Sequence, residues 1–290
     1  MRKNTAEALI ESVIKLSALL SSAVIFSMVL FLIVSSLPVF NTVSPIDFIF
    51  GLDWNPFRGF YGIFPMIVGS FLVTILALAF AIPLGVGCAI FLAELAPKKI
   101  QKILRPSIEI LTAIPSVVYG FVGMVLFVPL IRDIFNTNPG YSWFSASIIL
   151  GIMILPTITV ISEDAINSVP YHLKEGSLAL GATRWQTVKK VILPASLSGI
   201  ISGIILGMGR AIGETMAVLM VAGNWALIPT SIFDPVRPLT SHIVLNIKET
   251  ASGSPIYYAM FATGLVLFLM VLILNIISQY VNKKYRIKWD

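Results

Sequence analysis

Apolar residues fall into six long runs separated by short polar segments, and this pattern predicts six membrane-spanning helices. A helix needs about 20 mainly apolar residues to cross the hydrocarbon core of a bilayer, and each run is close to that length or longer. Arg210 and Glu214 interrupt the fifth run, which is therefore the least apolar of the six. The predicted spans cover residues 16–37, 67–91, 110–130, 144–162, 196–222 and 256–280.

The composition agrees with an all-α, polytopic membrane protein. Hydrophobic residues make up 57% of the chain and charged residues only 12%, whereas soluble domains carry about 25% charged residues. Basic residues precede the first run, as in a signal peptide, but the run is longer than a signal sequence requires and no clear cleavage site follows. We therefore expect a retained first helix. The single cysteine, Cys88, lies inside an apolar run and is interpreted as a packing residue.

The distribution of lysine and arginine predicts the orientation of the chain. Fifteen of the 20 lie in four segments that alternate spans place on one side: the N-terminus, residues 98–105, residues 174–190 and the C-terminus. Cytoplasmic loops carry the excess of these residues, so we expect both termini in the cytoplasm of a multi-pass cell-membrane protein. The net charge of +6 then reflects topology rather than binding to nucleic acid. The other side holds Arg58, Arg132, Arg237 and Lys248.

One outer segment, residues 224–255, carries a helical pattern of its own. Leu239, Ile243 and Ile247 recur every four residues, which predicts a short amphipathic helix or gate at the outer surface. Arg237 and Lys248 in this segment either attract anions or simply solvate a loop, and the sequence leaves both interpretations open.

The chain lacks the motifs of an enzyme. It contains no G-x-x-x-x-G-K-[ST] loop to hold ATP phosphates. The two histidines, His172 and His242, fall on opposite sides of the predicted membrane, so we expect no metal site and no cofactor. Glu163 and Asp164 are adjacent and are interpreted as a solvated helix end. These absences favour a transport subunit over a catalytic one.

The longest cytoplasmic stretch is expected to be residues 163–193, and we call residues 170–194 the coupling segment. Its pattern predicts two short helices with a bend at Gly181, exposing an apolar patch with a charged rim, and Pro194 is expected to begin the fifth span. From these residues alone, an interfacial helix on anionic lipid and a docking element for a soluble partner are both open.

The coupling segment resembles the signature loop of ABC-importer permeases, which reads E-A-A, three residues, G, nine residues and I-x-L-P. The spacing matches over all twenty positions, although glycine, serine and valine replace two alanines and the isoleucine. This resemblance implies that the loop docks on a separate ATPase subunit and transmits its motion. The residues assigned to this role are Glu175, Gly176, Ser177, Gly181, Ala182, Leu193 and Pro194.

The resemblance extends over residues 69–280 to the phosphate-specific branch, and GRAIGETMAV (residues 209–218) is similar to its PstC-type subunit. It implies a type I ABC importer permease fold in the lipid bilayer. It also implies three kinds of partner: a second permease subunit (PstA-like), two ATP-binding subunits (PstB-like) and an extracytoplasmic phosphate-binding protein (PstS-like). We divide the chain into residues 1–65 (first helix and outer loop), 66–280 (transmembrane core) and 281–290 (cytoplasmic tail).

Arg210 and Glu214 are the candidate residues of the substrate path. Four residues apart on one predicted helix, they are expected to share a face and form an ion pair at mid-membrane. A guanidinium buried there should face protein or water, and its donors suit phosphate oxygens. Glu214 would neutralise Arg210 when the path is empty. A purely structural ion pair is the alternative. In the resembling family, charged residues of this helix are tied to phosphate passage.

A second candidate point on the path is Pro115, which should free the carbonyl of Leu111 beside Thr112 and Ser116. Three other functions stay open at this stage. They are a permease for another oxyanion such as molybdate, sulfate or phosphonate, a gradient-driven transporter with Glu214 as proton carrier, and a purely structural membrane subunit.

Overall fold

A computed structural model describes residues 5–248 and 250–285, and the side chains of residues 9–248 and 250–283. The expected cytoplasmic charges of Arg2, Lys3, Lys284, Arg286 and Lys288 lie outside the described side chains. The elements, in chain order, are α1 (Thr5–Ser36), η1 (Leu37–Asn41), α2 (Pro45–Phe50), β1 (Trp54–Asn55), η2 (Pro56–Arg58), β2 (Phe60–Tyr61), α3 (Phe64–Ile90), η3 (Phe91–Leu95), α4 (Lys98–Ala113), α5 (Ser116–Val122), η4 (Gly123–Phe127), α6 (Val128–Phe135), α7 (Trp143–Asn167), α8 (Tyr171–Ala179), α9 (Arg184–Thr187), η5 (Val188–Ile192), α10 (Leu193–Gly213), α11 (Met216–Val221), α12 (Leu239–Ile247) and α13 (Pro255–Tyr285).

The fold is all-α, and the prediction of six spans is confirmed. Within the described residues, six helical stretches are long and apolar enough to cross a membrane. The strands β1 and β2 form a small antiparallel hairpin in the first outer loop and leave the fold class unchanged. The stretches are Leu9–Asn41, Phe64–Leu95, Ser116–Phe135, Trp143–Asn167, Arg184–Gly213 and Pro255–Lys283.

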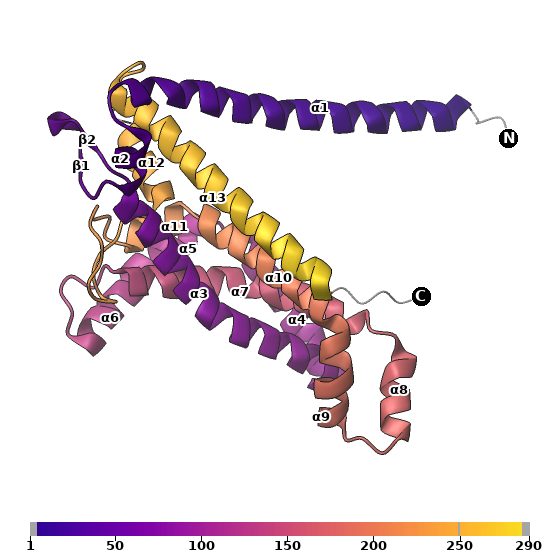
Figure 1. Ribbon diagram of the computed structural model, residues 1–290. Coiled ribbons are helices and arrows are strands. Elements are labelled where there is room, and N and C mark those ends of the chain that lie inside the picture. Colours follow the sequence, from indigo (N-terminus) through magenta and orange to yellow (C-terminus); the bar gives the residue numbers. More distant parts are fainter. Residues whose placement is uncertain (1–4, 249, 286–290) are drawn as a thin grey trace.

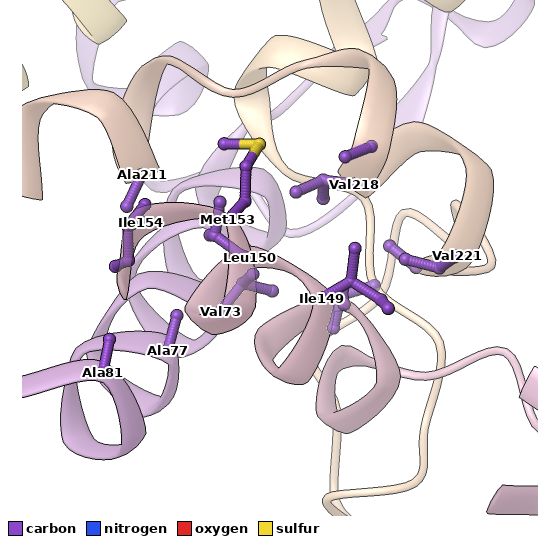
Figure 2. Packing of buried hydrophobic residues seen from close by; sticks show 14 of the residues in the cluster. Val73, Ala77, Ala81, Ile149, Leu150, Met153, Ile154, Ala211, Val218 and Val221 are labelled. Carbon is purple, nitrogen blue, oxygen red and sulfur yellow. The ribbon is translucent and has the colours of Figure 1, made fainter. Parts of the chain in front are cut away.

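Helix α7 lies at the centre of the bundle, with α3 and α10 packed along it (Figure 1). In an apolar stretch of 18 residues within this helix, 61% of the residues are buried by the rest of the chain. The share is 28% or less in the other five spans. A helix that is apolar on all sides is one that can be enclosed by its neighbours. Figure 2 shows the resulting core, in which side chains from α3, α7, α10 and α11 meet. Its labelled residues are Val73, Ala77, Ala81, Ile149, Leu150, Met153, Ile154, Ala211, Val218 and Val221.

Glycines bring α10 close to α7. Gly199, Gly203 and Gly207 recur every four residues and therefore share one face of the helix. A Cβ at Gly199 would lie 2.3 Å from the Ala165 Cβ, and one at Gly207 would lie 2.8 Å from the Ile158 Cγ1. Small residues let helices approach in this way in membranes, where van der Waals packing replaces the hydrophobic effect.

The two ends of the bundle differ (Figure 1). The basic helix α4, the arm formed by α8 and α9, and the C-terminal end of α13 lie at one end. The hairpin, α2 and α12 lie at the other end. Helix α1 diverges from the bundle, and its principal contacts are with η1 and α13. Two basic segments that the sequence assigns to one side of a membrane, residues 98–105 and 174–190, therefore lie at the same end.

The prediction for the third span was wrong at its start. Residues 110–113 belong to the amphipathic helix α4, and the span begins at Ser116. Proline has no N–H to donate and forces the preceding residue out of the helical region. Ile114 is accordingly extended, with φ −67° and ψ 127°, and the chain breaks between α4 and α5.

The short helix predicted from Leu239, Ile243 and Ile247 is confirmed. Helix α12 begins at Leu239 and ends at Ile247, with Pro238 before its first turn. Leu239 is fully buried, and it packs in an outer cluster with residues of α3 and α13. This helix therefore caps the end of the bundle that carries the hairpin, opposite the arm.

We predict that Gly199→Ala destabilises the protein, because the added methyl group meets the Cβ of Ala165 and the two backbones must separate. Overpacking of this kind costs about 1–3 kcal/mol. The matched control is Gly209→Ala, since no atom lies within 4 Å of a Cβ placed there. The control should be at least as stable as wild type, because alanine favours helix over glycine by about 1 kcal/mol. Thermal unfolding in detergent measures the stability of both variants. Equal unfolding midpoints for Gly199→Ala and Gly209→Ala would contradict the packing account.

Candidate functional site

The fifth span is broken at the position of Glu214. Helix α10 ends at Gly213, Glu214 is extended with φ −69° and ψ 130°, and α11 begins at Met216. The Glu214 Oε1 accepts a hydrogen bond from the backbone N–H of Ala217 at 3.1 Å. A carboxylate at this position satisfies an amide that has no partner within the first turn of α11. Glu214 is therefore a helix-capping residue.

The predicted ion pair between Arg210 and Glu214 was wrong. Residues four apart share a face only on a continuous helix, and this helix ends between the two. No carboxylate among the described side chains forms an ion pair with Arg210. Its Nη1 instead donates a hydrogen bond to the Thr157 Oγ1 at 3.2 Å.

The Arg210 guanidinium lies deep within the bundle. Thr157 is near the middle of α7 (Trp143–Asn167), so the contact is far from both ends of the central helix. Arg210 is half-buried and occupies the last turn of α10, where a positive charge also complements the helix dipole. The predicted depth of this residue is consistent with this position.

One side of α10 near Arg210 is not covered by the rest of the chain. Leu206 is 57% exposed, and a Cβ at Gly209 or Gly213 would meet nothing within 4 Å. Gly207 lies against Ile158 of α7, whereas Gly209 and Gly213 face open space. The guanidinium lies beside an open helix face.

The break before α5 brings a further polar group to this region. The carbonyl of Leu111, which Pro115 leaves without a helical donor, accepts a hydrogen bond from the Tyr119 hydroxyl at 2.8 Å. Helix α5 packs against α11, the helix that follows the break after Arg210. The sequence analysis missed Tyr119, although its place one turn after Ser116 puts the two on the same face of α5.

The two polar candidates at this break have ordinary local roles. The Thr112 Oγ1 donates to the carbonyl of Glu109 at 2.6 Å within α4. Ser116 is the first residue of α5, and both side chains are partly exposed. Thr112 and Ser116 therefore lie on either side of the break between α4 and α5.

The N-terminal end of α12 holds the helix break from the outer side. The Thr240 Oγ1 donates to the carbonyl of Glu214 at 3.0 Å, and the N–H of Leu239 donates to the Ser70 Oγ at 2.9 Å. A small cavity of about 10 Å³ lies among these groups and Thr74. It has room for about one water molecule.

An open cavity of about 490 Å³ lies beside the hairpin, at the end of the bundle opposite the arm. Two guanidinium groups line it, and the Arg237 Nε donates to the carbonyl of Asn224 at 2.7 Å. Lys248 does not line this cavity; it follows the last residue of α12. The lining residues are Asp53, Trp54, Asn55, Arg58, Phe60, Trp225, Ala226, Leu227 and Arg237.

At the opposite end, the coupling segment has the predicted two helices and glycine turn. Gly181 has a φ of +82°, which residues with a side chain rarely adopt, and it joins α8 to α9. Thr183 forms a capping box with Gln186 at the start of α9. Leu180 is 91% exposed and Trp185 is also exposed, so the predicted apolar patch is confirmed.

The residues of the signature loop are distributed over this arm. Glu175 and Gly176 are exposed on α8, and the Ser177 hydroxyl lies 3.0 Å from the Thr187 hydroxyl on α9. Ala182 lies beside Gly181 in the turn and is half-buried. The segment thus has an exposed surface and an internal contact that joins its two helices.

Pro194 does not begin the fifth span. Helix α9 continues through the π-helical turn η5 into α10, so the second coupling helix and the membrane span form one helix from Arg184 to Gly213. Leu193 and Pro194 are the first two residues of α10. The wide turn before Pro194 is one way in which a helix accommodates a proline that lacks an N–H.

The interpretation of Glu163 and Asp164 was wrong for one of the two residues. Asp164 is 57% exposed, but the Glu163 side chain is completely buried. Arg105 of α4 contacts both, with its Nη1 3.5 Å from the Glu163 Oε1 and its Nη2 2.8 Å from the Asp164 Oδ1. The pair therefore ties α4 to the end of α7. Across the described part of the chain, no group of three or more histidine, cysteine, aspartate or glutamate side chains is placed to bind a metal ion.

Comparison with known proteins gives a consistent result. A family model described as the binding-protein-dependent transport system inner membrane component matches residues 81–287. The chain is 44% identical over 274 residues to the probable ABC transporter permease protein YqgH of Bacillus subtilis (strain 168), which covers 93% of this chain and 89% of that protein. It is 39% identical over 252 residues to the phosphate transport system permease protein PstC of Pasteurella multocida (strain Pm70), which covers 80% of this chain and 78% of that protein.

Solved structures share the fold at low sequence identity. The structure of a bacterial alginate ABC transporter in complex with an alginate pentasaccharide-bound periplasmic protein matches with a TM-score of 0.62 and 16% identity, covering 94% of this chain and 96% of that chain. An inward-facing structure of the MetNI methionine ABC transporter matches with a TM-score of 0.59 and 19% identity. The match covers 76% of this chain and 94% of that chain. The prediction of an importer permease fold is confirmed.

The buried His242 of α12 gives a testable pH dependence. Burial, with a smaller contribution from the charge of Arg237, lowers the pKa of this imidazole from 6.5 to about 3, and its ring packs against Trp54 with centroids 4.2 Å apart. Below pH 6.5 the unfolded chain therefore binds a proton that the folded chain does not, and stability falls as the pH is lowered towards 3. Between pH 7.5 and 4.5 we expect wild type to lose about 2–3 kcal/mol more than His242→Leu.

Thermal unfolding of both proteins in detergent across this pH range measures the difference. All other titrating groups are common to the two proteins, so they cancel in the comparison. Parallel stability curves would contradict a buried neutral histidine.

Proposed function

The chain belongs to the family of binding-protein-dependent transport system inner membrane components, and from this premise we propose that it forms part of the transmembrane path for inorganic phosphate. It is a permease subunit of an ABC importer and a transport protein rather than an enzyme, with ATP hydrolysis in a separate subunit. Phosphate as the substrate is supported by the likeness to PstC of Pasteurella multocida. The specific residues of the path are our proposal.

The observation that carries this proposal is the Arg210 guanidinium in the middle of the bundle. It is half-buried, it donates to Thr157, and it has no carboxylate partner among the described side chains. A charged side chain at such a depth costs several kcal/mol unless water or an opposite charge reaches it. A guanidinium keeps its charge at any working pH and presents a fork of donors that matches phosphate oxygens.

We place the path along the open face of α10. Leu206, Gly209 and Gly213 leave this face uncovered beside Arg210, which suits a surface completed by a second, similar permease subunit. The break before α5, which packs against α11, supplies the neutral hydroxyl groups of Thr112, Ser116 and Tyr119, and we include them in the proposed path. Glu214 holds the helix break that ends this face, so its contribution is to position Arg210.

The partners follow from the family. An importer of this family works with an ATPase and a binding protein; the composition with one PstA-like permease subunit, two PstB-like ATPase subunits and a PstS-like phosphate-binding protein is our proposal. The exposed patch around Leu180 and Trp185 suits a groove on an ATPase subunit. The outer cavity with Arg58 and Arg237 suits delivery of an anion from the opposite side.

The orientation and the division of the chain are also proposed. With the ATPase on the side of the arm, α4, α8, α9 and the end of α13 face the cytoplasm, and both termini lie there. We retain residues 1–65 as a peripheral helix and outer loop and 66–280 as the transmembrane core. In the proposed tail, 281–290, the helix α13 continues to Tyr285, and residues 286–290 lie outside the described residues.

Uptake of labelled phosphate into cells or proteoliposomes that contain the complete transporter tests the substrate. We expect unlabelled phosphate to compete, and sulfate, molybdate and phosphonate to compete poorly. If one of those three anions competed more strongly than unlabelled phosphate, that anion would be the substrate and the assignment of phosphate would be wrong. Uptake that survives removal of ATP would contradict an ATP-driven mechanism.

We predict that Arg210→Gln abolishes phosphate uptake, with a loss of at least about 30-fold, because a buried charge-assisted contact of this kind is worth 2 kcal/mol or more. Assembly of the complex and ATP hydrolysis by the partner subunit should persist. The control is Arg132→Gln, which removes an arginine whose side chain is 51% exposed and paired with Asp133. Normal uptake by Arg210→Gln would rule out the anion site, and loss of assembly would assign Arg210 a purely structural role.

A further inference from the structure

Helix α8 of the coupling segment projects from the bundle as part of an arm (Figure 1). The backbone joins it to α7 through residues 168–170 and to α9 through the turn at Gly181. Its contact through Ser177 and Thr187 stays within the arm, because α9 also belongs to it. A displacement of α8 therefore needs a further connection if it is to reach the other side of the bundle.

That connection is an ion pair between Lys174 and Glu94. The Lys174 Nζ of α8 contacts the Glu94 Oε2, which lies in the π-helical turn η3 at the end of α3. The two residues are 80 positions apart in the sequence. The Glu94 side chain is only 10% exposed and that of Lys174 is 32% exposed, so the pair is shielded from water on most sides. Shielding makes the attraction between the charges stronger than at an open surface.

Packing does not fill the space around this pair. A cavity of about 280 Å³ lies between α8, α9 and the end of α3, and both charged residues line it together with Tyr171, Leu178 and Thr187. Among the described residues, the ion pair is the polar contact that joins α8 to the end of α3 across this gap. Because α3 packs closely along the central helix α7, a force on its end reaches the core of the bundle.

We propose that Lys174 and Glu94 are a positioning pair that transmits movement of α8 to α3 during the transport cycle. The proposal rests on the proposed function, in which an ATPase subunit pushes the arm. The arm then acts on two membrane helices at once, on α10 through the continuous backbone from α9 and on α3 through the ion pair. Loss of the pair leaves the backbone connection and the apolar packing of η5 against the end of α3, but no direct link from α8 to α3. ATP hydrolysis then continues while fewer anions cross per ATP.

The experiment measures the ratio of ATP hydrolysed to anion imported in proteoliposomes with the complete transporter. The variants are Lys174→Met, Glu94→Gln, the double variant with both changes, and the charge reversal Lys174→Glu with Glu94→Lys. The double neutral variant avoids leaving a mostly buried charge without a partner, so it remains informative if a single variant folds poorly. Lys15→Met is the control, because it removes a lysine whose ion pair with Glu11 lies within α1.

We expect the single and double neutral variants to use about fivefold to tenfold more ATP per anion, as for contacts with substantial coupling. The charge reversal should bring the ratio of ATP to anion back to within about twofold of the wild-type value. The Lys15→Met variant should have the wild-type ratio. An unchanged ratio in the neutral variants would overturn the proposal. So would a failure of the charge reversal to restore the ratio, or loss of the ATPase subunit from the Lys174→Met complex, which would make Lys174 a docking residue.

The assay runs with phosphate and, in parallel, with sulfate and molybdate. If wild type imports one of the latter instead of phosphate, the substrate assignment fails, and the ratio is measured with the anion that is carried. The two hypotheses therefore fail on different measurements.

Discussion

A chain that crosses a lipid bilayer must satisfy its backbone polar groups without help from water, and this constraint shapes every break in the bundle. At the break before α5, the Leu111 carbonyl is satisfied by the Tyr119 hydroxyl. At the end of α10, the Glu214 carboxylate accepts from the N–H of Ala217, while its own carbonyl accepts from Thr240. At both of these breaks, polar side chains therefore satisfy the interrupted backbone. A substrate path also needs polar groups, and these two breaks supply some of them.

The same constraint explains how the arm remains connected to the membrane region. Three π-helical turns, η3, η4 and η5, each end two residues before a proline: Pro97, Pro129 and Pro194. A wide turn lets the chain approach a residue that has no N–H without losing the hydrogen bonds around it. At η5 the result is an unbroken helix of 30 residues from Arg184 to Gly213. At about 1.5 Å per residue it is roughly 45 Å long, so one stiff element joins the coupling segment to the turn that carries Arg210.

Local patterns in the sequence predict the parts of this structure that depend on local physics. Six apolar runs predict six spans, Leu239, Ile243 and Ile247 predict α12, and Gly181 predicts the turn of the arm. The errors arise where distant residues decide the outcome. Glu214 ends a helix where Thr240 of α12 binds its carbonyl, and Glu163 is buried where Arg105 of α4 reaches it. Neither contact can be predicted from the spacing of nearby residues, because each joins residues that are far apart in the sequence. In addition, the four-residue spacing of Arg210 and Glu214 places them on one face only if the helix is continuous.

The correction at Glu214 changes how an anion would be released. If Glu214 were paired with Arg210, it could compete with a bound anion and free it without any movement. Its carboxylate instead caps α11, so the positive charge of Arg210 is not neutralised by a neighbouring carboxylate. A site with constant charge weakens its hold on an anion only if the geometry of its donors changes. Arg210 lies in the last turn of α10, directly before the break, and the other end of this continuous helix is the arm. Under the proposed function, movement of α10 relative to Thr157 would alter the donors around the anion, so release would follow from the force applied at the coupling segment.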